Sequence, residues 1–347
     1  MRIIIDAMGG DNAPHEIVKG AVAAQREFKI DITLVGKEEA VTPCLRNEGV
    51  APADLHFDVV DAREVIDMED DASTATRSKK DSSMAVALKL LSDGEGDAVI
   101  SAGNTGALLT GATLTVKRIK GIRRAALAPV FPVGEKGAML IDCGANVECT
   151  PEYLMQFAYM GSHYARAVLG YAAPRIGLLN VGTEETKGGD LQKEAYKLLK
   201  KASEAGKLNF IGNIEARDVL FGAADVIVTD GFTGNILLKS IEGSVAFLMS
   251  ELKKLFYKSA KAKLAAGMIK NDLQGLKTMF DVNEVGGTAL LGISKTVIKA
   301  HGSSDARAVR SAAKQAITFI KKGVIDGIVE NIDEMRVEKS DLSISAE

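Results

Sequence analysis

Tryptophan is absent from the sequence, and aromatic residues make up only 5% of its 347 residues. A basic excess is also missing, because 43 lysines and arginines are outnumbered by 46 aspartates and glutamates, giving a formal net charge of -3. A protein that binds nucleic acid usually shows a strongly basic balance. The composition therefore argues against a nucleic-acid partner.

Cysteine is scarce, with only Cys44, Cys143 and Cys149 in the chain. An odd number without close pairing fits neither a disulfide framework nor a zinc site. The four histidines show no spacing typical of a catalytic triad or a metal site. We therefore expect a reducing cytoplasm, no metal and no cofactor.

Long hydrophobic runs are missing as well. Asp6 interrupts the N-terminal apolar run too early for a secretory signal. The longest uncharged stretch, Ala98 to Val116, contains too many serine, asparagine and threonine residues to span a bilayer. We expect a cytoplasmic protein without a transmembrane helix.

Hydrophobic residues nevertheless make up 46% of the chain, and short runs rich in isoleucine and valine alternate with longer segments of helical period. This alternation is typical of a doubly wound α/β fold. The predicted strands are Arg2 to Asp6, Ile32 to Val35, Leu55 to Val60, Ala98 to Ser101, Ala126 to Val130, Ala138 to Asp142, Arg175 to Asn180, Leu208 to Gly212, Ala224 to Thr229 and the segment VGGTALLG. The predicted helices are Pro14 to Phe28, Glu38 to Asn47, Ser82 to Leu91, Gly106 to Val116, Pro151 to Leu169, Asp190 to Ala205, Gly234 to Met249 and Asp305 to Lys322.

We expect a single three-layer α/β/α domain over residues 1–332, built on one large, mostly parallel sheet. A helical excursion over residues 244–280 interrupts the alternation, and the charged segment 333–347 reads as a frayed tail.

Glycine and polar residues gather in the loops that follow the predicted strands. In an open α/β sheet, ligands bind beyond the carboxyl ends of the strands, near helix N-termini. The loops are DAMGGDNAP (6–14), SAGNTGALL (101–109), DCGANVECTP (142–151), NVGTEETKGG (180–189), GNIEARD (212–218) and TDGFTGN (229–235). Any one of them is explained by a tight turn and a helix cap. Together they predict a shared anion pocket, although none matches a dinucleotide fingerprint or a P-loop.

With HGSSD (301–305), these motifs resemble the bacterial phosphate acyltransferase family, also called acyl-acyl-carrier-protein:phosphate acyltransferase. The resemblance extends from Met1 to about Glu330 and implies transfer of a fatty acyl chain from acyl carrier protein to inorganic phosphate for phospholipid synthesis. It also implies a homodimer and a fold related to phosphotransacylases and to isocitrate and isopropylmalate dehydrogenases. The sequence departs from the family pattern at Val285, where a tyrosine is expected before the glycines.

Phosphate attack on a thioester requires a bound anion, donors for the oxyanion and an exit for the thiolate, but no strong general base. Lys187 is the leading candidate to pair with phosphate, the alternative being an ordinary exposed lysine. Asn104, at a helix start, is expected to bind phosphate or the oxyanion, the alternative being a plain helix cap. His301 is either a proton shuttle or a structural histidine.

Further candidates share the same loops. Asn146 and Asn235, each beside a glycine, are weaker candidates to bind phosphate. Four carboxylates either orient Lys187 or a neighbouring donor or act as helix caps, namely Asp6, Asp11, Glu185 and Asp230. The additional substrate-binding residues are Asp6, Gly9, Gly10, Asp11, Gly103, Thr105, Gly106, Gly144, Gly182, Thr183, Asp230 and Gly234, and Glu185 is placed with the catalytic group.

Cys143 raises a separate possibility, because a thiol can accept an acyl chain in a covalent route. It ends a predicted buried strand and has no neighbouring base in the sequence. We favour an inert core cysteine and direct attack by phosphate.

Carrier proteins are acidic, so their docking face should be locally basic. The segment TVKRIKGIRR supplies Lys117, Arg118, Lys120, Arg123 and Arg124. A second, weaker candidate is RSKKDSS, with Arg77, Lys79 and Lys80. A solvated charged surface is the alternative for both.

The helical excursion carries an apolar stripe beside many lysines, and its candidate membrane contacts are Leu252, Leu255, Phe256 and Lys258. Such a helix packs against a dimer partner or lies on an anionic membrane. Membrane contact would suit a product consumed by a downstream membrane acyltransferase. Two rival functions stay open: a phosphotransacylase that uses short acyl-coenzyme A, and a non-catalytic adaptor for carrier protein or membrane.

Overall fold

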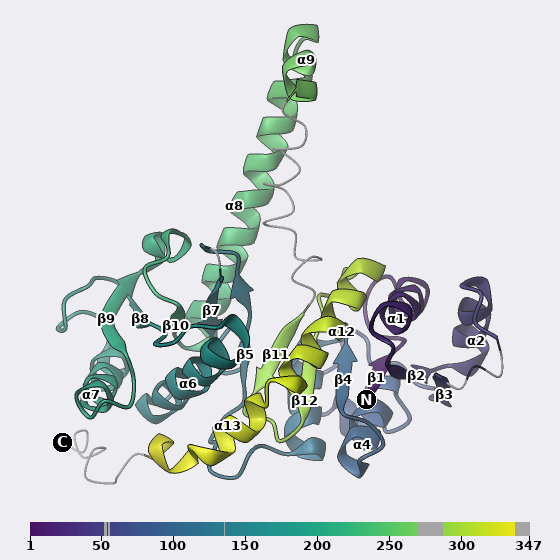
Figure 1. The fold of residues 1–347 in the computed structure, drawn as a ribbon, viewed down its shortest axis with the longest axis horizontal. Helices are drawn as coiled ribbons and strands as arrows, with labels where there is room; N and C mark the ends of the chain where they lie inside the picture. The colour runs from purple at the N-terminus through teal and green to yellow at the C-terminus, as the bar shows by residue number, and fades with distance from the viewer. Residues whose placement is uncertain (52–53, 55, 135, 269–286, 337–347) are drawn as a thin grey trace.

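The computed structural model describes residues 1–51, 54, 56–134, 136–268 and 287–336, and its strands form two sheets (Figure 1). The first sheet has the order β3-β2-β1-β4-β12-β11-β5, from β1 (Arg2–Asp6), β2 (Asp31–Gly36), β3 (Phe57–Asp61), β4 (Ala98–Ser101), β5 (Ala126–Ala128), β11 (Thr288–Leu291) and β12 (Thr296–Lys299). The second has the order β6-β7-β10-β8-β9, from β6 (Val130–Phe131), β7 (Ala138–Ile141), β8 (Ile176–Asn180), β9 (Phe210–Glu215) and β10 (Val226–Val228). The pairing is parallel except where β11 meets β12 and β5, and where β6 meets β7.

Helices cover both faces of these sheets. Their bounds are α1 (His15–Phe28), α2 (Glu38–Asn47), α3 (Ala75–Ser78), α4 (Ser83–Asp93), α5 (Thr105–Gly111), α6 (Pro151–Tyr164), α7 (Asp190–Glu204), α8 (Gly231–Tyr257), α9 (Ala260–Met268), α12 (Ala306–Lys321) and α13 (Val324–Glu330). Shorter helical turns are η1 (Ala112–Val116), η2 (Ala165–Leu169), η3 (Ala216–Phe221) and η4 (Ile332–Met335).

The central strand β1 shows why the sequence reads as a buried parallel sheet. Ile3 and Ile5 belong to the apolar cluster that includes α1 and α12, whereas Ile4 belongs to the cluster on the opposite face with α4. All three are at most 1% exposed, because a strand covered on both faces has no polar side. The predicted mixed α/β fold class is confirmed.

The strand material is divided between two sheets, whereas the sequence suggests one. The predicted strand Ala126 to Val130 pairs with β11 through β5 and then with β7 through β6, so this segment belongs to both sheets. The Cys143 amide donates to the Leu127 carbonyl at 3.0 Å, and the Leu140 amide donates to that of Pro129 at 2.9 Å. Pro129 lies between β5 and β6 and brings no amide hydrogen of its own. We call residues 126–132 the crossing segment.

Two strand predictions need correction. The sequence analysis missed β12, a four-residue strand inserted between β4 and β11. It also ended a strand at Gly212, whereas β9 continues to Glu215. Ile211 is skipped in the pairing of β8 with β9, so β9 contains a bulge at this residue. The motif GNIEARD therefore begins inside β9 and not after it.

Helix α8 stands out from the body of the molecule, with α9 near its far end (Figure 1). The helical excursion is thereby confirmed as far as Met268, while residues 269–280 and the divergent Val285 lie outside the described residues. Residues 333–335, expected in a frayed tail, lie in η4, where Met335 is fully buried. In the described part of the chain, no helix has the length and hydropathy needed to cross a bilayer.

Candidate active site

Three loops meet at the carboxyl ends of β1, β4 and β12, which are neighbours in the first sheet. The Asp11 amide donates to the Gly302 carbonyl at 2.8 Å, and the Asn12 side chain donates to the Ser303 carbonyl at 3.1 Å. The Ser101 hydroxyl donates to the Asp6 carboxylate at 2.6 Å. The motifs DAMGGDNAP, SAGNTGALL and HGSSD are therefore brought together, as the sequence predicts.

The adjacent glycines of DAMGG have a packing role. A Cβ atom on Gly9 would lie 2.5 Å from an Asp6 carboxylate oxygen and 2.7 Å from the Gly103 nitrogen. Gly10 has a φ of +98°, and its Cβ atom would lie 2.9 Å from the Gly302 carbonyl oxygen. Only glycine allows the loops to approach this closely.

A cavity of about 480 Å³ opens beside these loops, bounded by the end of β12, the crossing segment and the first half of α8. Its polar lining is Thr105, Cys143, Asn235, Lys239, Glu242, Thr288, Lys299 and His301. Its apolar lining is Leu127, Pro129, Val130, Phe131, Pro132, Leu238, Ile241, Val245 and Ala246. The volume falls within the range of ligand pockets, roughly 300–1,000 Å³.

Lys299 lines this cavity but was not among the residues predicted from the sequence. It ends β12 and is only 8% exposed, and its ammonium donates to the carbonyl oxygens of Ala102, at 3.4 Å, and Ala300. Burial lowers the pKa of Lys299 to about 8, with Lys239 acting in the same direction and Asp6 and Asp11 opposing it. The available signal was a lysine at the end of an apolar run directly before HGSSD.

His301 lines the cavity, and its Nδ1 lies 2.9 Å from the Ser303 hydroxyl. Partial burial lowers the pKa of His301 below its usual range, and the neighbouring Lys239 and Lys299 act in the same direction. The imidazole is therefore neutral at pH 7. A neutral imidazole offers an acceptor for a proton.

Asn104 takes the capping role that the sequence left open as the alternative. Its side-chain oxygen accepts from the Ala107 amide at 3.0 Å at the start of α5. Its side-chain nitrogen donates to the carbonyl oxygens of Asp67, Met68 and Asp70 at 3.2 to 3.3 Å. The amide group is thus engaged within the protein, and its neighbour Thr105 lines the cavity instead. Gly106 is required by packing, because a Cβ atom there would lie 2.6 Å from the Cβ atom of Ala72.

The loops of the second sheet are organised around Asp142. Its carboxylate accepts from the amides of Leu127, Cys143, Ala145 and Asn146 and from the Asn146 side chain, at 2.7 to 3.3 Å. Asn146 also donates to the Ala125 carbonyl at 2.8 Å, so its side chain joins the two sheets. Burial raises the pKa of Asp142 to about 6.

Helix α8 begins directly against this loop. Asp230 caps α8 by accepting from the Thr233 amide at 2.8 Å, and a Cβ atom on Gly234 would lie 2.0 Å from the Asp142 carbonyl oxygen. Gly144 has a φ of +97° and faces Asn235. Of the predicted residues in these two loops, Asn235 lines the cavity.

Lys187 lies elsewhere. Its loop, which also contains Thr183 and the buried Gly182, follows β8 and is mostly exposed, and no described residue of 181–189 lines the cavity. The predicted pairing of Glu185 with Lys187 is not what the structure shows, because Glu185 binds the Lys200 ammonium at 2.8 Å and the Tyr196 hydroxyl at 2.9 Å. The prediction that all loops share one pocket with Lys187 therefore needs correction. The first-sheet loops, Cys143 and α8 form the cavity without it.

Cys143 lines the cavity but is only 6% exposed, and its thiol lies 3.6 Å from the Gly234 carbonyl oxygen. Burial raises the pKa of Cys143 to about 12, and the negative charge of Asp142 contributes. The thiol is therefore protonated at neutral pH, and a protonated thiol is a weak nucleophile.

The basic segment 117–124 alternates exposed cations with the buried Ile119 and Ile122. Arg118, Arg123 and Arg336 border a separate cleft of about 340 Å³ with Glu152 and Gln156. In the second basic segment, the Lys79 ammonium binds the Asp70 carboxylate at 2.5 Å and the Val65 carbonyl at 2.9 Å. Lys79 therefore stabilises its own loop.

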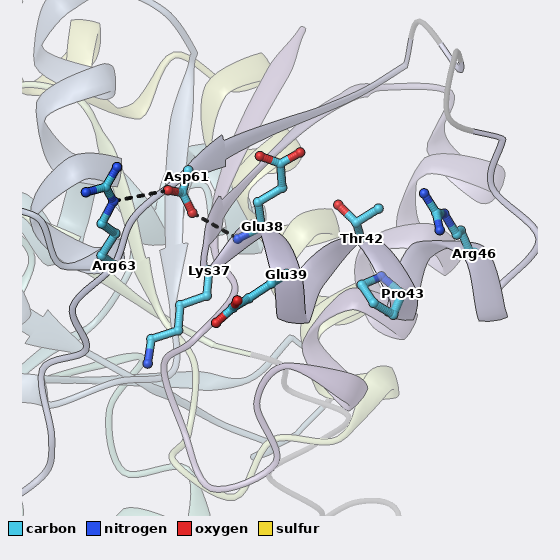
Figure 2. Close-up of a pocket in the computed structure, with 8 residues that line it drawn as sticks. All are labelled: Lys37, Glu38, Glu39, Thr42, Pro43, Arg46, Asp61 and Arg63. Carbon is cyan, nitrogen blue, oxygen red and sulfur yellow. Dashed lines mark hydrogen bonds and ion pairs between the residues drawn. The ribbon is translucent and has the colours of Figure 1, made fainter.

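A larger cleft, of about 710 Å³, lies beside α2 and the end of β3 (Figure 2). Its charged lining is evenly mixed, with Lys37, Arg46 and Arg63 beside Glu38, Glu39 and Asp61. Figure 2 shows that Asp61 bonds both Arg63 and the Glu38 amide, so its carboxylate is already engaged. The described residues contain no group of three or more histidine, cysteine, aspartate or glutamate side chains that could hold a metal ion.

Comparison with known proteins identifies the family. A family model described as "Fatty acid synthesis protein" matches residues 1–327. A curated phosphate acyltransferase from Clostridioides difficile is 48% identical over 339 residues, which is 97% of this chain and 98% of the relative. The chain belongs to the phosphate acyltransferase family. A second member, from Geobacillus thermodenitrificans, is 49% identical over 335 residues, covering 96% of this chain and 99% of the relative. The prediction of an acyltransferase enzyme is thereby confirmed.

Solved structures place the family within a wider fold. A phosphotransacetylase from Streptococcus pyogenes aligns with a TM-score of 0.59 at 20% identity, covering 91% of this chain and 94% of the other. A 4-hydroxythreonine-4-phosphate dehydrogenase from Klebsiella pneumoniae aligns with a TM-score of 0.51 at 14% identity, covering 91% and 98%. The predicted relationship to phosphotransacylase folds and dehydrogenase-like folds is confirmed at the level of the fold.

Proposed function

We propose that this phosphate acyltransferase transfers a long-chain fatty acyl group from acyl carrier protein to inorganic phosphate, forming an acyl phosphate for phospholipid synthesis. The observation that carries the proposal is the mixed lining of the cavity of about 480 Å³. Lys239, Lys299 and His301 supply groups suited to an anion, and the crossing segment with one side of α8 supplies an apolar wall suited to an acyl chain.

The reaction is written as direct attack. A phosphate oxygen attacks the thioester carbonyl, a C–O bond forms, the C–S bond breaks, and the thiolate leaves to take up a proton from water. Thr105 and Asn235 are the proposed donors to the carbonyl oxygen, since both line the cavity. His301 accepts the proton when dihydrogen phosphate is the attacking species.

The protonated state of Cys143 supports direct attack over a covalent acyl-enzyme. Changing Cys143 to serine should retain acyl transfer within about threefold, because the thiol takes no part in the chemistry. Initial rates with saturating phosphate measure this, and Cys149→Ser is a control outside the cavity lining. Complete loss of activity in a folded Cys143→Ser protein would restore the covalent route.

The function is tested with the purified chain, inorganic phosphate and two acyl donors, palmitoyl carrier protein and acetyl-coenzyme A. Acyl phosphate trapped with hydroxylamine should appear with the carrier-protein donor. Exclusive turnover of acetyl-coenzyme A would instead make the chain a short-chain phosphotransacylase. Tight binding of carrier protein without product from either donor would make it an adaptor.

The proposed partners are acyl carrier protein, phosphate and a second copy of the chain. The exposed cations of segment 117–124 are the proposed carrier-protein contact. Helix α8 and α9 expose large apolar side chains along the projecting part, among them Phe247, Leu255, Leu264 and Met268. We propose that this surface serves the homodimer or a membrane near a downstream acyltransferase, in a cytoplasmic protein.

A further inference from the structure

We propose that Lys299, rather than Lys187, is the side chain that binds the phosphate in this cavity. This inference rests on the proposed function and assigns a residue to its anion site. Lys187 is the candidate that the sequence motif suggests, and Lys299 is the candidate that lines the cavity.

The placement of Lys299 is the first argument. It ends β12, whose neighbour β4 leads into the loop 101–106, so its side chain lies where the first-sheet loops meet. The side chain lines the cavity although the residue is only 8% exposed. The carbonyl oxygens of Ala102 and Ala300 accept from its ammonium and fix its direction.

The second argument is that Lys299 has no counter-charge in direct contact. Within the described residues, no carboxylate lies within 4.0 Å of the Lys299 ammonium, although charged side chains are rarely buried without a partner. The Asp6 carboxylate accepts from the Ser101 hydroxyl, and Asp6 and Asp11 raise the pKa of Lys299 only from longer range. Carbonyl oxygens satisfy the N–H groups but bring no negative charge into direct contact with the ammonium.

The cavity holds further groups suited to an anion near Lys299, although Asp6 and Asp11 oppose the effect of Lys239 on its pKa. Lys239 projects from α8 into the same cavity, and His301 follows Lys299 by two residues. Lys239 is paired with Glu242 at 2.7 Å, so the charge left to attract an anion is that of Lys299. An ammonium has three donors, of which an anion such as phosphate accepts those turned to the cavity.

Lys187 lacks each of these features. It is exposed on the β8–α7 loop, outside the cavity lining, where its ammonium is open to water. A lysine in that setting needs no counter-ion.

The test measures phosphate binding without an acyl donor, by isothermal titration and by the rise in Tm with phosphate against chloride at matched ionic strength. The variants are Lys299→Met, Lys299→Gln and Lys187→Ala. The control Lys295→Met removes another β12-region lysine, whose ammonium binds the Leu91 carbonyl at 2.7 Å outside the cavity lining.

We expect wild type, Lys187→Ala and Lys295→Met to bind phosphate alike, and both Lys299 variants to lose at least about tenfold in affinity. Lys299→Gln keeps donors for the carbonyl oxygens, so it serves if Lys299→Met does not fold. Unchanged phosphate binding in a folded Lys299 variant, or its loss in Lys187→Ala alone, would overturn the inference.

Acyl transfer is measured separately with the same proteins. If no donor gives acyl phosphate but phosphate binding still depends on Lys299, the proposed function fails and the anion site stands. If acyl phosphate forms with an unchanged phosphate KM in Lys299→Met, the function stands and the inference fails.

Discussion

At the scale of single residues, burial acts on two cavity side chains in the same sense. It raises the pKa of Cys143 to about 12 and lowers that of Lys299 to about 8, because a low-dielectric site disfavours the charged form of either group. For the thiol, this suppresses nucleophilic chemistry. The Lys299 ammonium is still mostly charged near pH 7, and because it is buried, a bound anion would stabilise it.

The same burial predicts a pH-dependent effect of Lys299→Met on stability. An unfolded lysine has a pKa of about 10.4. Below about pH 8 the lysine is charged in both states, and the native state carries a cost of up to about 3 kcal/mol. Between about pH 8 and 10 the unfolded chain binds more protons, so wild-type stability gains from rising pH.

We therefore expect Lys299→Met to exceed wild type by up to about 3 kcal/mol at pH 7, with the difference shrinking as pH rises above 8. Urea unfolding in phosphate-free buffer from pH 6 to 9.5 measures it. The charged groups that act on the pKa of Lys299 are Asp6, Asp11 and Lys239, and His301 lies nearby. All four residues are kept in the variant, so that only the lysine charge is removed. A variant less stable than wild type by the same amount at every pH would contradict the prediction.

Several site residues could be predicted from the sequence because their loops carry glycine beside polar groups. Thr105, Asn235 and His301 were chosen in this way and line the cavity. Lys299 was not, because a lysine at the end of a short strand usually marks a solvated surface. Asn104 shows the reverse error: its position at a helix start is the same for a cap as for an anion ligand, and only the contacts distinguish them.

At the scale of elements, α8 presents two different stripes of side chains to the cavity, one apolar and one polar. Leu238, Ile241 and Val245 recur at intervals of three and four residues and form the apolar part of the cavity wall. Asn235, Lys239 and Glu242 form a neighbouring polar stripe. The first part of the helix therefore presents both an apolar and a polar stripe to the cavity, as the proposed acyl phosphate would require.

Changing Val245 to tryptophan should narrow the apolar part of the cavity. We expect kcat/KM for palmitoyl carrier protein to fall at least about tenfold, and for an octanoyl donor to fall much less, because a bulky group in a pocket costs about 1–3 kcal/mol. Rates with donors of increasing chain length measure the shift.

Ser244→Trp is the matched control for this change, since Ser244 is exposed on the same helix and does not line the cavity. An equal loss for all chain lengths in Val245→Trp would contradict an acyl wall at this position.

Element prediction succeeded where the apolar period was long. Helix α1 and strand β1 were found at their observed positions within one residue, because each presents a continuous buried pattern. Strand β12 was missed, since its short run has a threonine at one end and Lys299 at the other and so offers only two apolar residues. The bulge at Ile211 was not predictable from composition, so Gly212 was taken for a strand end.

At the scale of the whole molecule, the two sheets meet where the crossing segment passes Asp142. The carboxylate binds the Leu127 amide of β5 and the loop after β7, and Asn146 binds the Ala125 carbonyl. The sequence predicted Asn146 as a ligand for phosphate, whereas its side chain joins the two sheets. A division into two sheets left no trace in the sequence, because the crossing segment reads as one ordinary strand.

Changing Asp142 to alanine should destabilise the protein by about 3 kcal/mol or more, because it leaves several buried N–H groups without an acceptor. Urea unfolding at pH 7 measures the free energy of unfolding. Asp93→Ala, which removes an exposed pair with Lys89, should cost less than about 1 kcal/mol. A similar small cost for Asp142→Ala would show that the junction does not depend on its carboxylate.

The cavity is lined by residues from both sheets, and this has a thermodynamic consequence. Lys299 comes from one sheet, Cys143 from the other, and Leu127 from the segment common to both. Any ligand that fills this space contacts the parts of the protein built on both sheets. The free energy of ligand binding therefore depends on how the two sheets are oriented, and a bound ligand in turn favours one orientation. A substitution at Asp142, where the two sheets meet, should therefore change ligand affinity even though Asp142 does not line the cavity.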